Sequence, residues 1–106
     1  MARIVKSGLI QICIPKSEGD GTIEEIKEAI VQKHIPLIEN AGRLGVQILC
    51  LQEIFNTPYF CPGQDVKWYE SAETIPGSTI ERMQEYAKKY QMVMIVPIFE
   101  KEQAGM

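Results

Sequence analysis

The residue best placed to do chemistry is Glu53, a carboxylate that directly follows an apolar stretch. Residues 46–51 carry no charge, which is typical of a strand buried on both faces of a parallel sheet. Open α/β sheets bind ligands beyond the carboxyl ends of their strands, which is where Glu53 falls. The aromatic residues that follow it and could wall the carboxylate are Phe55, Tyr59, Phe60 and Trp68. In such surroundings the carboxylate would be partly desolvated and therefore basic enough to accept a proton.

Other reactive side chains have plainer interpretations. Cys61 lies close to Glu53 in the sequence and could be a nucleophile, but we expect it to pack as a small apolar residue in a loop. Cys13 and Cys50 fall within predicted strands and are expected in the core. The single histidine, His34, lies on the apolar stripe of a predicted helix, which favours a buried, hydrogen-bonded side chain over a catalytic one.

Metal, nucleotide and nucleic-acid sites are not indicated. One histidine and no C-x-x-C spacing make a zinc site improbable, so we expect no metal. The glycines do not form a G-x-G-x-x-G motif, so we expect no nucleotide cofactor. The net charge of −3 and the lack of a basic cluster argue against binding to nucleic acid or an anionic membrane.

The elements that would position Glu53 follow from periodicity and turn signals. We predict a first strand over residues 4–14, a helix that starts at a Thr22–Glu25 capping box, and a second strand from Val46. Pro36 is expected to kink this helix. A long loop with a short helical turn over residues 65–72 comes next. A second helix starting at a Ser78–Glu81 capping box and a third strand over residues 92–99 complete the order.

This order predicts an α/β fold of the βαβαβ type, with parallel strands and at most one small domain over residues 1–106. Two helices can cover little more than one face of three strands, so the fold should be incomplete and expose apolar surface. No segment has the length of a membrane span or the apolar core of a signal peptide. Three cysteines, two of them in apolar strands, fit reduced thiols, and we expect a cytoplasmic protein.

The stretch Cys50-Leu-Gln-Glu-Ile-Phe-Asn-Thr-Pro-Tyr-Phe-Cys-Pro62 resembles the nitrilase, or carbon–nitrogen hydrolase, superfamily. The matching positions are Glu53 at the strand end, Phe55 two residues on, and Tyr59 beyond. Gln52 departs from the proline that most members carry there. Pro76-Gly77 and Val96-Pro97-Ile98 extend the likeness over essentially the whole chain. Within the superfamily, the stretch looks most like the N-carbamoyl amide hydrolases.

The resemblance implies an αββα sandwich of which this chain forms the N-terminal βαβαβ part. It implies a Glu-Lys-Cys triad in which Glu53 is the general base and Phe55, Tyr59 and Phe60 line the substrate pocket. The lysine and the nucleophilic cysteine are expected beyond Met106. The implied substrate is a small linear amide, an N-carbamoyl amine or N-carbamoyl β-amino acid, hydrolysed to the free amine, CO2 and ammonia. A homo-oligomer and no cofactor are also implied.

A second hypothesis of another class stays open. The chain could be an inactive truncated or fragment module that associates with full-length subunits or another partner. Without the nucleophile, the chain by itself is expected to be inactive, because the covalent path is closed to it.

Overall fold

The computed structural model describes residues 3–16, 19, 21–58 and 66–101. The elements in chain order are β1 (Ser7–Leu9), α1 (Ile23–Arg43), β2 (Ile48–Cys50), the 3-10 helix η2 (Val66–Ser71), α2 (Ser78–Tyr90) and β3 (Val93–Ile95). This order confirms the predicted α/β class. It also confirms the short helical turn that was predicted near residues 65–72.

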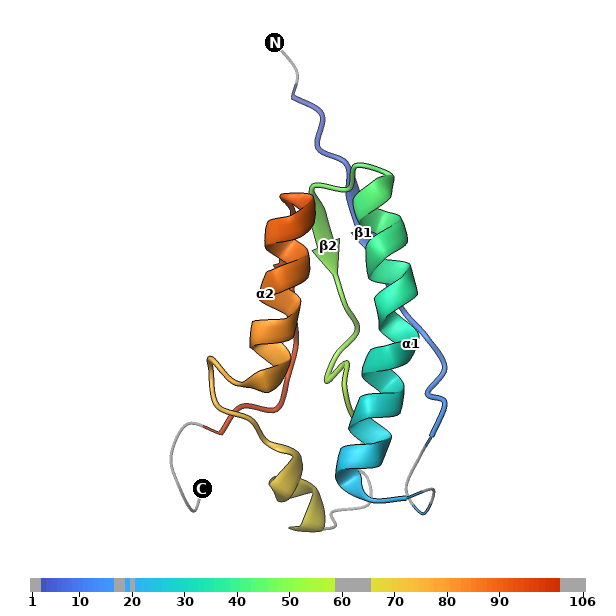
Figure 1. The fold of residues 1–106 in the computed structure, drawn as a ribbon, viewed down its shortest axis with the longest axis vertical. Helices are drawn as coiled ribbons and strands as arrows, with labels where there is room; N and C mark the ends of the chain where they lie inside the picture. The colour runs from blue at the N-terminus through green and yellow to red at the C-terminus, as the bar shows by residue number, and fades with distance from the viewer. Residues whose placement is uncertain (1–2, 17–18, 20, 59–65, 102–106) are drawn as a thin grey trace.

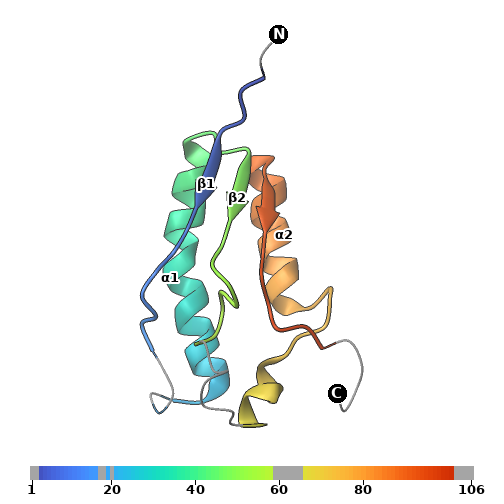
Figure 2. The ribbon, with the colours of Figure 1, turned by 180° about the vertical axis from the view of Figure 1, so that it is seen from behind.

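The three strands form one parallel sheet in the order β1-β2-β3. The two helices lie on the same face of this sheet. Figure 1 shows α1 and α2 in front of the strands, and the opposite view in Figure 2 shows the strands in front of the helices. The described part of the chain is therefore a two-layer structure, with helices on one face and no layer on the other.

The outer face of the sheet is apolar and exposed. Side chains alternate across a strand, so Gly8, Leu49 and Met94 share the helix-facing row of the register. Exposed side chains of the neighbouring rows include Leu9 (83% exposed), Ile48 (36%), Val93 (61%) and Ile95 (49%). The expectation that β2 is buried on both faces is therefore wrong for this chain. The expectation of an incomplete fold with exposed apolar surface is confirmed.

The strands are shorter than predicted because backbone pairing stops early. The first strand was expected over residues 4–14, but beyond Ile10 the amide of Ile12 donates to the side-chain Oε1 of Gln52 (2.7 Å) instead of to a strand. The third strand was expected over residues 92–99 and ends at Ile95. Pro97 has no N–H for a ladder, although its carbonyl still accepts from the amide of Phe55 (3.0 Å).

Helix α1 begins where the sequence predicts. The hydroxyl of Thr22 accepts a hydrogen bond from the amide of Glu25 (3.2 Å), which satisfies one of the free amides of the first turn. The helix continues through Pro36 to Arg43. Gly45 follows with a φ of 77°, a left-handed conformation that glycine adopts without a steric penalty. This glycine turns the chain back toward β2.

The start of α2 differs from the prediction. The N-cap residue is Gly77, and the predicted Ser78–Glu81 capping box does not form. Instead, the carboxylate of Glu73 accepts from the amide of Thr79 (3.1 Å) and from the hydroxyl of Ser78 (3.3 Å). A carboxylate is a stronger acceptor than a hydroxyl at the positive end of a helix, which explains why the loop supplies the cap.

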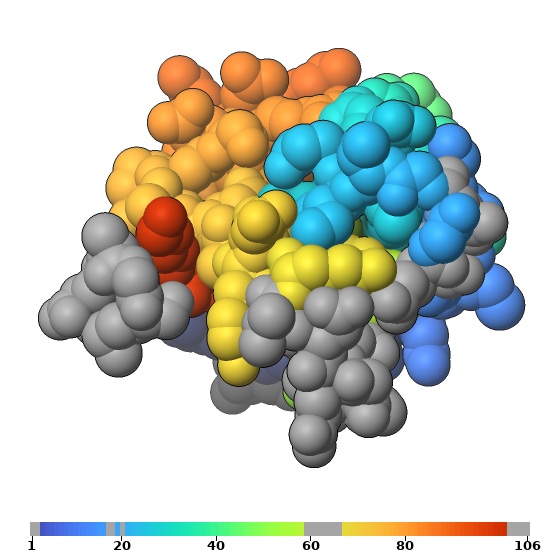
Figure 3. Space-filling view, turned by 90° about the horizontal axis from the view of Figure 1, so that it is seen from below, coloured from blue at the N-terminus to red at the C-terminus, as the bar shows by residue number. Residues whose placement is uncertain are grey.

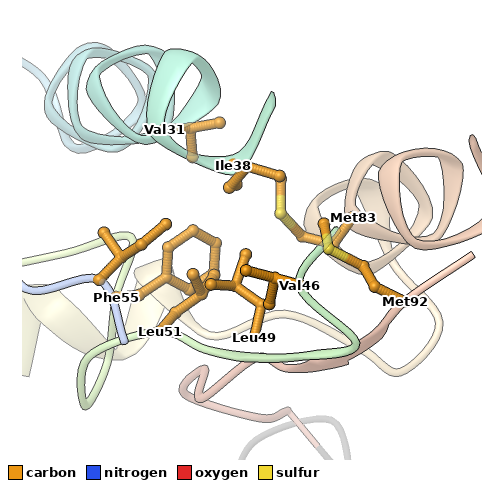
Figure 4. Close-up of a cluster of buried hydrophobic side chains, with 9 residues drawn as sticks. Val31, Ile38, Val46, Leu49, Leu51, Phe55, Met83 and Met92 are labelled. Atoms are coloured by element: carbon orange, nitrogen blue, oxygen red, sulfur yellow. The ribbon is translucent and has the colours of Figure 1, made fainter. Parts of the chain in front are cut away.

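The core lies between the helices and the inner face of the sheet. Figure 4 shows Val31 and Ile38 pointing from α1 toward side chains of β2 and its flanking segments, with Met83 of α2 and Met92 beside them. The buried members of this cluster are Ile10, Val31, Ile38, Val46, Leu49, Leu51, Phe55, Met83 and Met92. This packing fixes the end of β2, from which the Glu53 turn leaves.

The helices approach each other closely at Gly42. A Cβ atom at this position would lie 2.3 Å from Cγ of Tyr90 on α2, so the tyrosine ring would have to move. We expect Gly42→Ala to destabilise the protein by about 1–3 kcal/mol from overpacking. A gain of about 1 kcal/mol in helix propensity would offset only part of this loss. Urea unfolding of Gly42→Ala and of Gly42→Ala/Tyr90→Ala measures it, and the double variant should recover stability relative to Gly42→Ala. A more stable Gly42→Ala variant would contradict this prediction.

Candidate active site

Glu53 begins a tight turn over residues 53–56, three residues after the end of β2 at Cys50. The next residue, Ile54, has a φ of 44°, which is a strained conformation for a β-branched side chain. Such strain costs on the order of 1–3 kcal/mol and persists only where the surrounding structure enforces it. Strained residues of this kind cluster at functional sites, so this turn is a candidate site on geometric grounds.

The turn is held by contacts on the residues that follow Ile54. The amide of Phe55 donates to the carbonyl of Pro97 (3.0 Å), and the amide of Thr57 donates to the carbonyl of Ile54 (3.3 Å). Asn56 is buried, and its side-chain amide donates to Glu73 (2.8 Å) and to Thr79 (3.3 Å). The backbone at Glu53 is thereby fixed from the strand on one side and from a buried anchor on the other.

The Glu53 side chain is exposed. It lines a hollow of about 250 Å³ together with Leu9, Ile10, Gln11, Leu51 and Gln52. Leu9 is among the exposed residues of the outer sheet face. Because the carboxylate is exposed in the described chain, its desolvation stays a prediction for a protein in which the hollow is covered. A covering layer would meet Glu53 at the carboxyl ends of β1 and β2.

Two aromatic residues predicted to wall Glu53, Phe55 and Trp68, are buried in the core and do not line the hollow. Phe55 is fully buried in the core, where its ring meets the edge of His34 at 5.1 Å between centroids. Trp68 packs with Ile26 and Ile30 in a second buried cluster. Neither ring is among the described residues that line the hollow beside Glu53. Phe55 supports the turn from within the core, and its contact with substrate stays a prediction.

Several predicted residues lie outside the described part of the chain. Tyr59 and Phe60, predicted to line the substrate pocket, and Cys61, weighed as a nucleophile, belong to this group. Cys13 and Cys50 are free thiols; Cys50 is half-buried in β2, whereas Cys13 is exposed, contrary to the expectation of a core position. The described residues contain no group of three or more His, Cys, Asp or Glu that could hold a metal ion.

A largely buried ionic cluster, which contacts the Glu53 turn through Asn56, was not predicted from the sequence. Lys27 of α1 lies 2.7 Å from Oε2 of Glu73, and the two side chains are only 10% and 11% exposed. Lys27 also donates to the carbonyl of Ser71 (3.0 Å), and the hydroxyl of Thr79 donates to Glu73 (2.7 Å). Figure 3 shows the end of the molecule where this cluster lies, with η2 (yellow) against the first part of α1 (light blue).

The charge of Glu73 is stabilised by its donors. Burial raises the pKa of its carboxyl, but the hydrogen bonds from Lys27 and Thr79 outweigh burial and hold the pKa below the ordinary value. Glu73 is therefore ionised at neutral pH. A signal for the cluster was present in the sequence, because Lys27 falls on the apolar stripe of α1 between Ile26 and Ile30. A lysine on such a stripe requires a buried acid as its partner.

His34 is fully buried, as the sequence predicts. We assign its Nδ1–H as the donor to the carbonyl of Ile30 (2.9 Å), which leaves Nε2 as an acceptor with no partner in the described part of the chain. Burial lowers the pKa of this imidazole, more than the Ile30 carbonyl raises it, and nearby Lys33 lowers it further. The ring is thus a neutral packing partner of Phe55.

This histidine makes stability depend on pH. The unfolded state takes up a proton near the ordinary histidine pKa of about 6.5, whereas the folded state does so only at lower pH. The stability is therefore fully present above this value and decreases as the pH falls from it through the lower folded pKa. We expect the free energy of unfolding to drop from pH 7.5 to pH 5.0, and to drop less in His34→Gln. Equal drops in both proteins would contradict this prediction.

A family match covers the segment that contains this site. Residues 8–106 match the carbon–nitrogen hydrolase family, and this range covers nearly the whole chain, including β2, the Glu53 turn and β3. The chain belongs to the carbon–nitrogen hydrolase family. In this family member, the described residues contain no helix that is long and apolar enough to cross a membrane.

This carbon–nitrogen hydrolase chain is similar to several curated proteins. It is 38% identical to a β-ureidopropionase of Arabidopsis thaliana over 102 residues, which are 94% of this chain and 24% of that protein. It is 38% identical to an N-carbamoylputrescine amidase of Solanum lycopersicum over 65 residues, 60% of this chain and 22% of that protein. An omega-amidase of Xenopus tropicalis is 32% identical over 84 residues, 78% of this chain and 29% of that protein.

The chain thus spans about a quarter of the length of the curated relatives it matches. The part that is present carries one candidate catalytic carboxylate and an uncovered sheet face. The activity, the substrate and the partners of the whole protein are therefore proposals.

Proposed function

We propose that this chain supplies the general base, Glu53, of a carbon–nitrogen hydrolase that acts on an N-carbamoyl amine or an N-carbamoyl β-amino acid. The observation that carries the proposal is the strained, anchored turn that places Glu53 in a hollow at the carboxyl end of β2. The exposure of Glu53, beside a sheet whose outer face no described segment covers, supports a site completed by a second layer. The likeness to β-ureidopropionase and N-carbamoylputrescine amidase supports the substrate class.

The proposed chemistry assigns one task to Glu53 at each stage. A cysteine thiol from the remainder of the domain loses its proton to the carboxylate, and the thiolate attacks the carbamoyl carbon. The leaving nitrogen departs after accepting a proton, which leaves a thioester-like acyl-enzyme. Glu53 then removes a proton from water, which hydrolyses this intermediate. If the substituted amine leaves first, the acyl-enzyme is a thiocarbamate, and its hydrolysis frees the thiol and carbamic acid. Carbamic acid then breaks down to CO2 and ammonia, so the products are the free amine or amino acid, CO2 and ammonia.

Covering the hollow would prepare Glu53 for this role. The carboxylate is exposed in the present chain, and an apolar cover would desolvate it and make it a stronger base. The lysine that the resemblance implies would stabilise the oxyanion from that same cover. Small linear amide substrates need no metal or organic cofactor in this scheme. A cytoplasmic homo-oligomer, as predicted from the sequence, belongs to the same proposal.

The second candidate is an inactive module that binds full-length subunits or another partner. The exposed apolar face of the sheet favours it, because Leu9, Val93 and Ile95 would be covered by association. In this case Glu53 would have no catalytic partner on its own chain.

One experiment separates the two candidates. The endogenous protein is captured with an antibody to this segment, its intact mass is measured, and ammonia release from N-carbamoyl-β-alanine and N-carbamoylputrescine is assayed. A mass more than double 12.0 kDa together with turnover of either substrate is expected for the hydrolase. A mass near 12.0 kDa without turnover would establish the inactive module instead. A larger protein with no turnover of either substrate would contradict the N-carbamoyl assignment.

A further inference from the structure

The carboxylate of Glu73 has two oxygens with different partners. Oε1 accepts from the amide of Thr79 (3.1 Å) and the hydroxyl of Ser78 (3.3 Å), and so caps α2. Oε2 accepts from Lys27 (2.7 Å), from the Thr79 hydroxyl (2.7 Å) and from the side-chain amide of Asn56 (2.8 Å). One buried carboxylate therefore joins both helices to the turn that carries Glu53.

Asn56 is the link between this carboxylate and the turn. It lies three residues after Glu53 and two after the strained Ile54, and it is 2% exposed. Its amide donates only to Glu73 and Thr79 among the described residues. On the other side, the amide of Phe55 is tied to Pro97 (3.0 Å). Without the Asn56 link, the hydrogen bonds that hold the turn within the described residues are this backbone anchor and the turn's own bond from Thr57 to Ile54.

We propose that Glu73 is a positioning residue, which acts through Asn56 to hold Ile54 at positive φ and so fixes the direction of the Glu53 carboxylate. This inference rests on the proposed function, in which Glu53 is the base. Glu73 itself does not touch the reacting atoms. A general base needs its carboxylate within hydrogen-bond reach of the proton it removes, and an error of about 1 Å can cost about 10²-fold in rate.

Asn56→Ala tests this role more cleanly than a change at Glu73. It removes the link to the turn but leaves the Lys27 ion pair and the α2 cap in place. In the natural full-length protein we expect kcat to fall by about 10²-fold, with KM changed less than about threefold, because the contact is remote from the substrate. Crystal structures of the same protein should show Ile54 at negative φ and the Glu53 carboxylate displaced.

Ser78→Ala is the matched control. It removes a hydrogen bond to the same carboxylate, at Oε1, whereas Asn56 donates to Oε2. We expect its kcat and the φ of Ile54 to stay as in the wild type. In a Glu73→Gln background, Asn56→Ala should cause no further loss of kcat, because the two residues act through one link.

The outcomes distinguish this inference from the proposed function. If the wild type turns over no N-carbamoyl compound, the proposed function fails, and the crystal structures still decide whether the link holds Ile54. An Asn56→Ala structure with Ile54 unchanged would overturn the positioning role. So would an active Asn56→Ala enzyme with wild-type kcat, or a kcat loss that Ser78→Ala shares equally.

Discussion

Glu53→Gln is expected to lower kcat of the full-length protein on N-carbamoyl substrates by about 10²–10⁴-fold, the usual contribution of a general base. Glutamine keeps the size and the hydrogen-bonding capacity of the side chain but cannot accept a proton at neutral pH. Because Glu53 is exposed and forms no hydrogen bond or ion pair with another described residue, stability should be nearly unchanged. Steady-state kinetics and urea unfolding of the variant measure the two effects.

Glu85→Gln is the control for this prediction. It removes a carboxylate that is also exposed but lies on α2, away from the hollow, and its kcat should match the wild type. If Glu53→Gln retained full kcat, Glu53 would not be the base. If Glu53→Gln lost activity together with several kcal/mol of stability, the loss would be structural and the assignment of Glu53 would lack support.

The parts of the fold that follow from local patterns could be predicted from the sequence. The Thr22 cap, the apolar stripe of α1 and the apolar run before Glu53 each depend on residues close together in the chain. The strand ends could not be predicted so well. They depend on which backbone groups find a partner across the sheet, as with Ile12, whose amide bonds to the side chain of Gln52.

The support of the candidate site could not be predicted, because it consists of contacts distant in sequence. Lys27 and Glu73 are 46 positions apart by their residue numbers, and Asn56 joins them from a third segment. Ser78 and Glu81 fit the capping pattern locally, but a better acceptor arrives from the preceding loop. The burial of Phe55 likewise depends on its packing against the His34 ring of α1. The local pattern predicted that Glu53 follows the second strand. It did not predict which distant contacts hold the Glu53 turn in place.

The second large effect is expected at Glu73. Glu73→Met should lower the free energy of unfolding by about 3–5 kcal/mol, because it leaves the buried Lys27 ammonium without a counter-ion. It also removes the cap of α2 and the acceptor of Asn56. Lys27→Met should cost less, because the Glu73 carboxylate keeps its donors on Asn56, Ser78 and Thr79. Urea unfolding at pH 7 measures both variants.

The two single variants should therefore differ in their cost to stability. The double variant Lys27→Met/Glu73→Met should be more stable than Glu73→Met alone, because no unpaired charge remains. Arg82→Met breaks the exposed pair with Glu28, in which the side chains are 36% and 54% exposed, and should cost less than about 1 kcal/mol.

The pKa of Glu73 is lowered on folding, so the stability it provides is present above the ordinary glutamate pKa and is lost as the pH falls through the folded value. In Glu73→Met this acid-dependent loss should shrink. Equal costs for the two single variants would show that the carboxylate depends on Lys27 alone, and its contacts to the turn and to α2 would then carry little energy.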